Sequence, residues 1–182
     1  MKKIQSPVDE STLKNLKAGE KVLLSGTIIS GRDAAHKRIY EALQIGQDLP
    51  VEIKGHTIYY VGPAPAKPNQ IIGPAGPTTS GRMDVYTPAL LDRGLKVMIG
   101  KGRRERWVIE SIRANGAVYL AAVGGTAAIM AKSIQSVEVI AYEDLGTEAV
   151  RRMEVKDMPL IVAIDANGTD YYDLGPNLYK NT

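Results

Sequence analysis

The chain has 182 residues, of which 44% are hydrophobic and 24% charged, which is typical of one compact soluble domain; without phenylalanine, its core must be largely aliphatic. A formal net charge of +3 is too small for the concentrated basic surface of a nucleic-acid-binding protein. The absence of cysteine excludes disulfides, thiolate zinc sites and any iron–sulfur cluster held by this chain alone, and the two histidines lack metal-ligand spacing.

The N-terminal residues predict neither a signal peptide nor a membrane anchor. They contain no apolar h-region, and no hydrophobic run approaches the roughly 18 residues of a transmembrane helix. We therefore expect a cytoplasmic protein. Residues 1–20 are polar and include Pro7 and Gly19, so they predict an N-terminal arm that leads into a single domain over residues 21–182.

Strands and short helices then alternate irregularly, which predicts an α/β domain with a mixed sheet. Strands are expected at 21–30, 51–61 with a break at Gly55, 95–99, 117–123 and 137–142, followed by a hairpin of 160–165 and 169–172 around Asn167-Gly168. Helices are expected at 33–44, 87–94, 103–114 and 126–134, with one or two helical turns at 147–153. Residues 62–82 are rich in proline and glycine and predict a long irregular loop, which in a compact domain is a linker or functional.

That loop ends in the segment GPAGPTTSGR, residues 73–82, which is our first candidate for a binding site. Its glycines allow backbone amides to face a common concavity. The hydroxyl groups of Thr78, Thr79 and Ser80, followed by Gly81 and Arg82, add donors for an anion. A surface turn with incidental hydroxyl groups is the alternative, and the immediate succession of hydroxyls and arginine favours the binding site.

A second candidate segment, SGRDAAH at residues 30–36, joins the first long strand to a helix. Arg32 stands just before the helix N-terminus, where free amides and the helix dipole favour an anion. Asp33 suits the N-cap of this helix. His36 follows one turn later and either supports the site or is simply exposed; taken alone, the residue favours exposure.

Lys101 lies between two glycines in VMIGKG, residues 97–102. This segment partly resembles two nucleotide-binding motifs, and it fits neither. The phosphate-loop pattern fails because Gly102 stands where Ser or Thr is required, and the dinucleotide pattern fails because Glu105 replaces its third glycine. The remaining interpretations are a cation held at a tight turn and an ordinary surface lysine. A further pair, Gly124-Gly125, precedes Thr126 and marks either a site or a close backbone crossing.

Together these segments bring Arg32, Arg82 and Lys101 to predicted strand ends, near the hydroxyl groups of residues 78–80. Three cations and several neutral donors suit a small dicarboxylate. The sequence contains no evident nucleophile–base pair, metal-ligand set or carboxylate pair. We therefore expect a chain that binds and orients a substrate without supplying the electrophile.

At these residues the sequence resembles the C-terminal domain, or separate β subunit, of class I fumarate hydratases and L(+)-tartrate dehydratases. The matching segments are LLSGTIISGRDAAHKR, GPAGPTTSGRMD, VMIGKG and AVGGTAA, in this order. The resemblance implies a swivelling β/β/α domain and a hydro-lyase that interconverts fumarate and (S)-malate. It also implies a cysteine-containing α subunit with a [4Fe–4S] cluster, and hence a hetero-oligomer, for which a heterotetramer is one arrangement.

The resemblance further implies roles for individual residues. Arg32, Arg82 and Lys101 would clamp substrate carboxylates, and Thr78 would act at the carbon that exchanges a proton, together with an acidic residue of the partner. The cluster iron would act as a Lewis acid on the departing hydroxyl. Further binding residues would be Thr79, Ser80 and Gly81, supported from behind by Asp33 and His36.

Two other functions fit the same residues. A β subunit of L(+)-tartrate dehydratase, which converts tartrate to oxaloacetate, would also bind a C4 dicarboxylate. A non-catalytic module that binds a dicarboxylate and regulates a partner belongs to a different class. A neighbouring gene for a cysteine-containing chain would favour the enzymes over the module.

Overall fold

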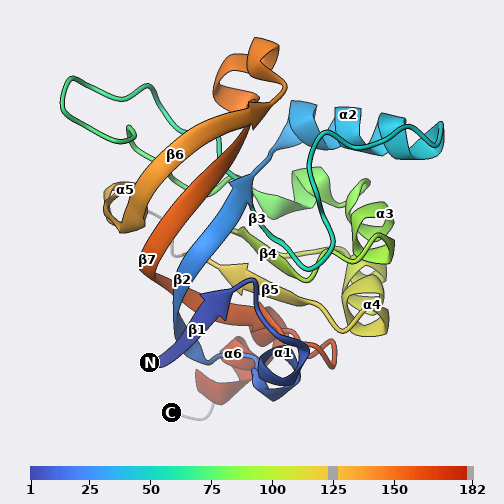
Figure 1. Ribbon diagram of the computed structural model, residues 1–182. Helices are drawn as coiled ribbons and strands as arrows, with labels where there is room; N and C mark the ends of the chain where they lie inside the picture. The colour runs from blue at the N-terminus through green and yellow to red at the C-terminus, as the bar shows by residue number, and fades with distance from the viewer. Residues whose placement is uncertain (123–126, 180–182) are drawn as a thin grey trace.

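Seven strands form one mixed sheet in the computed structural model, which describes residues 1–122 and 127–179 (Figure 1). Their order is β1-β2-β3-β4-β5-β7-β6, and the additional pairing of β2 with β7 closes β2, β3, β4, β5 and β7 into a barrel. The predicted α/β class with a mixed sheet is confirmed. The strands are β1 Lys2–Ser6, β2 Lys21–Ser30, β3 Thr57–Tyr59, β4 Val97–Gly100, β5 Val118–Ala121, β6 Ile134–Ala141 and β7 Val150–Ile164.

The direction of the strands places the candidate segments at one end of the barrel. Strands β1 to β5 pair in parallel, whereas β7 is antiparallel to β2, β5 and β6. Parallel neighbours end at the same edge of a sheet. The ends of β2, β3 and β4 therefore lie together, and each leads directly into a segment predicted to contribute to the site.

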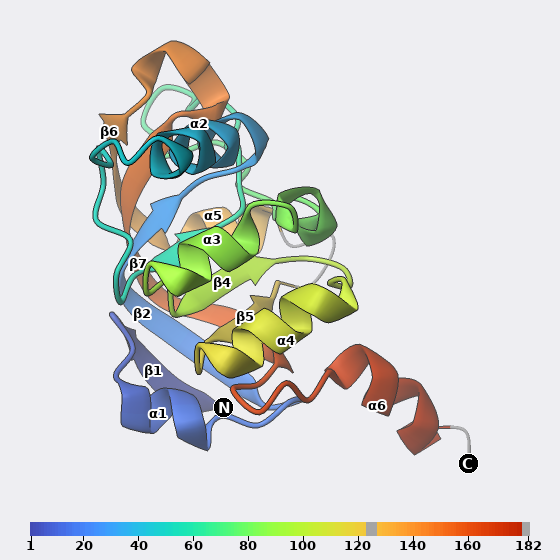
Figure 2. The ribbon, with the colours of Figure 1, turned by 90° about the vertical axis from the view of Figure 1, so that its right-hand side faces the viewer.

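Three helices cover one side of the barrel and follow one another along it (Figure 2). They are α2 Asp33–Gln44, α3 Thr87–Asp92 and α4 Arg106–Ala114. Helices α1 and α6 lie toward the end where β2 begins, and α5 lies beside the start of β6 (Figure 1). The remaining helices are α1 Glu10–Asn15, α5 Ala127–Ser133, α6 Tyr171–Tyr179 and two 3-10 helices, η1 Ser80–Met83 and η2 Glu143–Glu148.

Successive side chains of the short parallel strands belong to two different hydrophobic cores. In β4, Val97 and Ile99 join the core inside the barrel, whereas Met98 joins the core beneath the helices. In β5, Leu120 likewise joins the core inside the barrel, and Tyr119 joins the core beneath the helices. This alternation is the period of two that a pleated strand imposes. It explains why these strands are apolar without interruption, because both of their faces are buried.

The first twenty residues, predicted as an arm, contribute to the sheet and the core. Strand β1 pairs with residues 22–26 of β2, and Ile4, Leu13 and Leu16 are at most 5% exposed. Gly26 permits this pairing, because its φ is +104° and an added Cβ would lie 2.2 Å from the carbonyl oxygen of Ser6. The polar residues between the aliphatic ones concealed this packing. The division of the chain at residue 20 into arm and domain stays a prediction.

Strand β7 is the largest departure from the predicted elements. The helical turn predicted at 147–153 is wrong, because a 15-residue strand begins at Val150. The terminal hairpin is also wrong, since only an isolated bridge between Ile164 and Asp170 replaces its second strand, and α6 follows. Charged pairs and Pro159 obscured the alternation of buried and exposed residues along β7.

Other predicted elements are present with shifted ends. The strand predicted over 51–61 is limited to β3, because the chain turns at Gly55, where φ is +75°. The helix predicted from residue 103 begins at Arg106, and the helix predicted at 87–94 ends at Asp92. Residues 62–79 are irregular as predicted. The pair Gly124-Gly125 lies outside the described residues.

Candidate functional site

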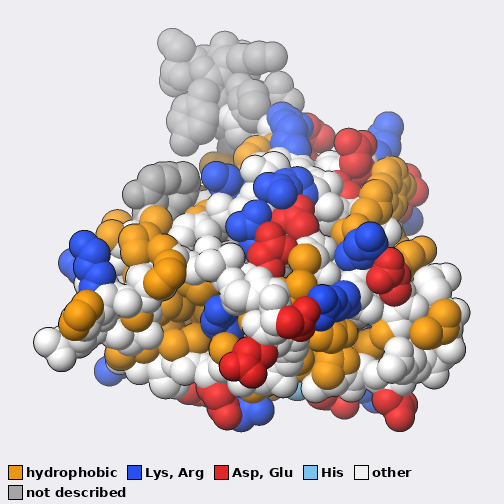
Figure 3. Space-filling model, turned by 90° about the horizontal axis from the view of Figure 1, so that it is seen from above, with side chains coloured by type: hydrophobic (Ala, Val, Ile, Leu, Met, Phe, Trp, Pro, Cys, Tyr) orange, Lys and Arg blue, Asp and Glu red, His pale blue; other side chains and the backbone are white. Residues whose placement is uncertain are grey.

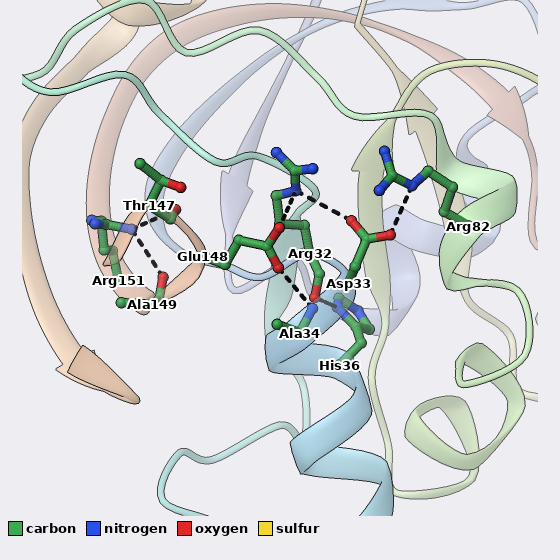
Figure 4. Close-up of polar contacts among 9 residues, drawn as sticks. All are labelled: Arg32, Asp33, Ala34, His36, Arg82, Thr147, Glu148, Ala149 and Arg151. Carbon is green, nitrogen blue, oxygen red and sulfur yellow. Dashed lines mark hydrogen bonds and ion pairs between the residues drawn. The ribbon is translucent and has the colours of Figure 1, made fainter. Parts of the chain in front are cut away.

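Two arginines from distant segments share one carboxylate at the N-terminal end of α2 (Figure 4). Nε of Arg82 lies 2.7 Å from Oδ1 of Asp33, and Nε of Arg32 lies 3.2 Å from Oδ2 of the same residue. Arg32 ends the β2–α2 connection, whereas Arg82 belongs to η1. The structure thus brings together two of the three predicted cations, with Asp33 between them.

Asp33 does not cap α2, so that prediction is wrong. Arg32 occupies the N-cap position with an extended backbone, and Asp33 is the first helical residue. Partial burial would raise the pKa of Asp33, but a hydrogen bond from its own backbone N–H, the hydrogen bond from Arg32 and the charge of Arg82 hold that pKa below its usual value. The carboxylate is therefore ionised at neutral pH and can anchor both guanidinium groups.

Glu148, which the sequence analysis did not single out, completes this cluster. Its Oε1 lies 3.2 Å from Nε of Arg32, and its Oε2 accepts a 2.8 Å hydrogen bond from the backbone N–H of Ala34. Glu148 ends η2, in the connection between β6 and β7. No local signal pointed to it, because Glu148 and Ala34 are 114 residues apart and residues 147–153 were predicted to form one or two helical turns.

The anchoring leaves the outer nitrogens of both arginines available. In the part of the chain that the structure describes, no group accepts a hydrogen bond from the Nη atoms of Arg32 or Arg82. Figure 4 shows these nitrogens beyond the carboxylates that contact Nε. The side chains are 24% and 53% exposed. A guanidinium group held in this way can offer two parallel N–H donors to a ligand carboxylate.

The hydroxyl-rich loop is fixed by backbone hydrogen bonds to the ends of β3 and β4. Thr78 donates its N–H to the carbonyl of Tyr60 over 2.7 Å and accepts from the N–H of Lys101 over 3.3 Å, while Ser80 donates its N–H to the carbonyl of Lys101 over 2.9 Å. Thr79 and Lys101 consequently form a parallel bridge. The third predicted cation therefore lies directly beside the loop that carries Arg82.

The side chains along this loop differ in what they present. The hydroxyl group of Thr78 is half-buried and bonds to no other described residue, whereas Thr79 and Gly81 are exposed. Lys101 is exposed, and none of the described carboxylates pairs with it. Thr78 and Lys101 thus keep the donors that the sequence analysis assigned to them.

Ser80, also predicted to bind substrate, turns its hydroxyl inward. Its Oγ lies 2.8 Å from the phenolic oxygen of Tyr119, which donates its single proton to the carbonyl of Gly102 over 3.0 Å, so Ser80 is the donor to Tyr119. The residue is fully buried. Gly100 makes room for it, because an added Cβ there would lie 2.0 Å from Oγ of Ser80. In this structure the hydroxyl group of Ser80 therefore helps to hold the loop in place through its hydrogen bond to Tyr119.

His36 is 1% exposed, so the interpretation of an exposed residue is wrong. Its Nδ1 lies 3.1 Å from the carbonyl oxygen of Arg32, which can only accept, so Nδ1 carries the proton. Nε2 has no partner among the described residues, and the ring packs edge-on against Tyr60. Burial lowers the pKa of His36 to about 4. The neutral imidazole therefore braces the segment that carries Arg32.

A buried ion pair, not predicted, holds the other side of the loop. Nε of Arg104 lies 2.5 Å from Oδ1 of Asp84, and the two side chains are 0% and 3% exposed. The guanidinium group also donates to Thr87 and lies over the rings of Tyr60 and Tyr119. Because Asp84 directly follows η1, this pair fixes the segment from which Arg82 projects.

Residues 2–175 of the chain match a protein-family model described as Fumarase C-terminus. This chain belongs to the fumarase C-terminus family. It is 42% identical to the anaerobic class I fumarate hydratase of Escherichia coli strain K12 over 151 residues, which cover 82% of this chain and 28% of that enzyme. It is 39% identical to fumarate hydratase 2 of Leishmania major over 173 residues, which cover 93% of this chain and 30% of that protein.

Another relative of this fumarase C-terminal chain has a comparable length. A protein of Methanocaldococcus jannaschii that carries the provisional name L(+)-tartrate dehydratase subunit beta is 38% identical over 167 residues, which cover 88% of this chain and 86% of that one. The chain thus spans less than a third of the fumarate hydratases above and most of this β subunit. The predicted family is confirmed.

The residues of this fumarase C-terminal chain do not fit the iron–sulfur cluster that the sequence resemblance implies for the enzyme. The sequence contains no cysteine, and among the described residues no three His, Asp or Glu side chains are placed to hold a metal ion.

None of the described helices is long and apolar enough to cross a membrane. Seen from above, acidic and basic side chains lie beside one another, which agrees with the paired arginines and carboxylates (Figure 3).

Proposed function

We propose that this chain is the substrate-clamping β subunit of a hydro-lyase that interconverts fumarate and (S)-malate. The observation that carries the proposal is the pair of arginines, Arg32 and Arg82, anchored through Nε on Asp33 with their Nη atoms available. Thr78 lies on the loop that leads to Arg82, and Lys101 lies directly beside that loop. Membership of the fumarase C-terminus family supports the same assignment.

The clamp suits a C4 dicarboxylate on chemical grounds. Arg32, Arg82 and Lys101 contact the two carboxylates and fix the carbon chain between them, and Thr79 and Gly81 line the approach. The anchoring carboxylates of Asp33 and Glu148 offset the two guanidinium charges. Lys101 therefore supplies the charge that remains without a partner among the described side chains.

We propose that Thr78 acts on a proton at the reacting carbon. A threonine hydroxyl is a poor base by itself, so an acidic residue of a partner shares this role. The backbone N–H and C=O of Thr78 are bonded to Tyr60 and Lys101, which hold this part of the loop in place. Thr78 thus positions and relays the proton, and the partner's acid accepts it.

The enzyme requires a second, cysteine-containing chain, because the proposed reaction belongs to an iron–sulfur family and this chain has no thiolate. We infer an α subunit that carries the [4Fe–4S] cluster and a permanent hetero-oligomer, a heterotetramer being one form. The 86% coverage of the M. jannaschii β subunit supports separate chains. A cytoplasmic location is part of the proposal.

The second candidate substrate is L(+)-tartrate, favoured by the name of that same relative. Fumarate and tartrate are both C4 dicarboxylates, and the clamp residues suit either. A regulatory module that binds a dicarboxylate without catalysis is the remaining alternative. The three functions predict different results with purified protein.

The test is co-purification from the native source under anaerobic conditions, followed by iron analysis and assays with fumarate, malate and tartrate. We expect an iron-containing partner, with activity in the complex and none in this chain alone. Turnover of fumarate by the iron-free chain would overturn the two-subunit mechanism. Saturable dicarboxylate binding without a cysteine-containing partner would establish the regulatory module instead.

A further inference from the structure

The connection between β6 and β7, residues 142–149, is docked on α2 next to the arginine clamp. Arg38 of α2 forms two hydrogen bonds with the carboxylate of Asp144, of 2.8 and 2.5 Å, and its guanidinium group lies 5.3 Å from the centre of the Tyr142 ring. These contacts fasten the connection to the middle of the helix. Glu148 then reaches the beginning of the same helix.

Arg151 holds the second half of this connection in shape. It donates to the carbonyl groups of Thr147 and Ala149 over 3.0 Å each (Figure 4). It also donates to the carbonyl group of Gly146 over 2.7 Å. Gly146 adopts a φ of +58°, which glycine tolerates at little cost. The backbone on both sides of Glu148 is thereby bound to one guanidinium group, which restrains the position from which the Glu148 side chain extends.

The contacts of Glu148 go beyond those of a helix cap. A cap requires only the hydrogen bond to the N–H of Ala34, which satisfies one free amide and suits the helix dipole. The second oxygen lies 3.2 Å from Nε of Arg32, which lies at the same distance from Oδ2 of Asp33. Glu148 is 22% exposed, so solvent screens the ion pair only in part.

We propose that Glu148 is a positioning residue for substrate binding, which together with Asp33 grips Nε of Arg32 and so directs its Nη atoms toward the substrate carboxylate. The inference rests on the proposed function for its kinetic consequence, but the positioning itself is a property of this chain. A guanidinium group gripped at one edge by two carboxylates loses side-chain freedom before the ligand arrives, which lowers the entropic cost of binding.

The first experiment measures positioning without activity. Glu148→Gln retains an oxygen that can accept from Ala34 but removes the charge facing Arg32. Glu138→Gln is the matched control, since Glu138 pairs with Arg152 on the same β6–β7 hairpin and is 67% exposed. In ¹H–¹⁵N spectra of the full chain, with the Nε–H signal of Arg32 assigned through Arg32→Lys, we expect Glu148→Gln to shift this signal and Glu138→Gln to leave it in place. An Arg32 signal unmoved by Glu148→Gln overturns the inference.

The second experiment is a double-mutant cycle in the complex with the proposed partner, assayed with fumarate. Glu148→Gln should raise KM about 10-fold with a smaller change in kcat, because a charge-assisted contact is misdirected in binding. On an Arg32→Lys background the same substitution should change KM by less than about 2-fold, since its target is gone. Equal effects on both backgrounds, or a lower KM in Glu148→Gln, would contradict positioning; the latter would mean that the carboxylate blocks the site.

The two experiments separate the failure of this inference from the failure of the proposed function. If the wild-type complex acts on neither fumarate nor tartrate, the proposed function is wrong, and the Nε–H signal of Arg32 still decides whether Glu148 positions that side chain. If the complex is active and the signal does not respond, the proposed function stands and the inference falls.

Discussion

Arg82 donates a 2.7 Å hydrogen bond from Nε to a carboxylate oxygen of Asp33, which lies 49 residues earlier in the chain. This contact joins the loop after β3 to the helix after β2. It fixes one edge of the Arg82 guanidinium group although the side chain is 53% exposed. A solvent-exposed arginine is thus oriented by the protein in advance of any ligand.

Arg82→Lys should lower kcat/KM about 10- to 100-fold in the complex, because an ammonium group cannot reproduce a two-point contact with a carboxylate. Hydrogen bonds to charged groups contribute roughly 1.5–3 kcal/mol, and about 1.4 kcal/mol corresponds to a factor of ten. Arg152→Lys is the control, because Arg152 is 54% exposed and also ion-paired, but on the hairpin. Steady-state kinetics on both variants test this prediction, and Arg152→Lys should keep wild-type kcat/KM. Full activity of Arg82→Lys in an assembled complex would refute the clamp.

Thr78→Ala should lower kcat with little change in KM, because the hydroxyl acts on the proton while the cations bind the carboxylates. The substitution leaves the backbone hydrogen bonds of residue 78 to Tyr60 and Lys101 intact, so the loop should keep its shape. Thr169→Ala, at a similarly half-buried threonine outside the site, serves as the control. Wild-type kcat in Thr78→Ala would reduce Thr78 to a loop residue.

Acidification should destabilise the protein through His36. The unfolded chain binds a proton at histidine below about pH 6.5, whereas the folded protein does so only near pH 4, so the unfolded state binds more protons between these values. The free energy of unfolding should therefore fall by about 3 kcal/mol on this account as pH decreases through the window. Urea unfolding from pH 7 to 4.5 should show a weaker pH dependence in His36→Gln than in the wild type. His56→Gln, at the partly exposed second histidine, should behave like the wild type.

Asp84→Asn should lower the free energy of unfolding by about 3–5 kcal/mol, because it leaves the buried charge of Arg104 without its partner. The pair is almost fully buried, so solvent cannot replace the lost carboxylate. Glu138→Gln breaks an exposed pair and should hardly move the urea midpoint. Equal midpoints for the two variants would show that Arg104 finds another counter-ion.

The local sequence pointed to the residues of the proposed clamp but not to the residues that hold them in place. Glycines, hydroxyls and cations at strand ends pointed to Arg32, Arg82 and Lys101, because parallel strands bring their ends together. Glu148 and Arg104 could not be recognised in the same way, since each is defined by a partner that folding brings from a distant segment. The burial of His36 could have been predicted from the sequence, because His36 lies three residues before Ile39 on the apolar face of α2.

The parallel strands were predictable because they are short and continuously apolar. Closure of the barrel was not, since it depends on β7, whose charges, backbone irregularity at Asp157 and Pro159 interrupt the alternating pattern. The first twenty residues mislead for a related reason. Their few aliphatic side chains become informative only when β1 is placed beside β2.

The pairing of β2 with β7 leaves the five barrel strands without a free lateral edge within the ring, so none can detach unless the ring opens. Deuterium should consequently enter the amides of β2 and β7 only through opening of the whole domain, at one shared rate. Residues 62–77, which have no strand of their own, should exchange far sooner. The barrel strands and the loop that leads to Arg82 are therefore expected to open independently of each other.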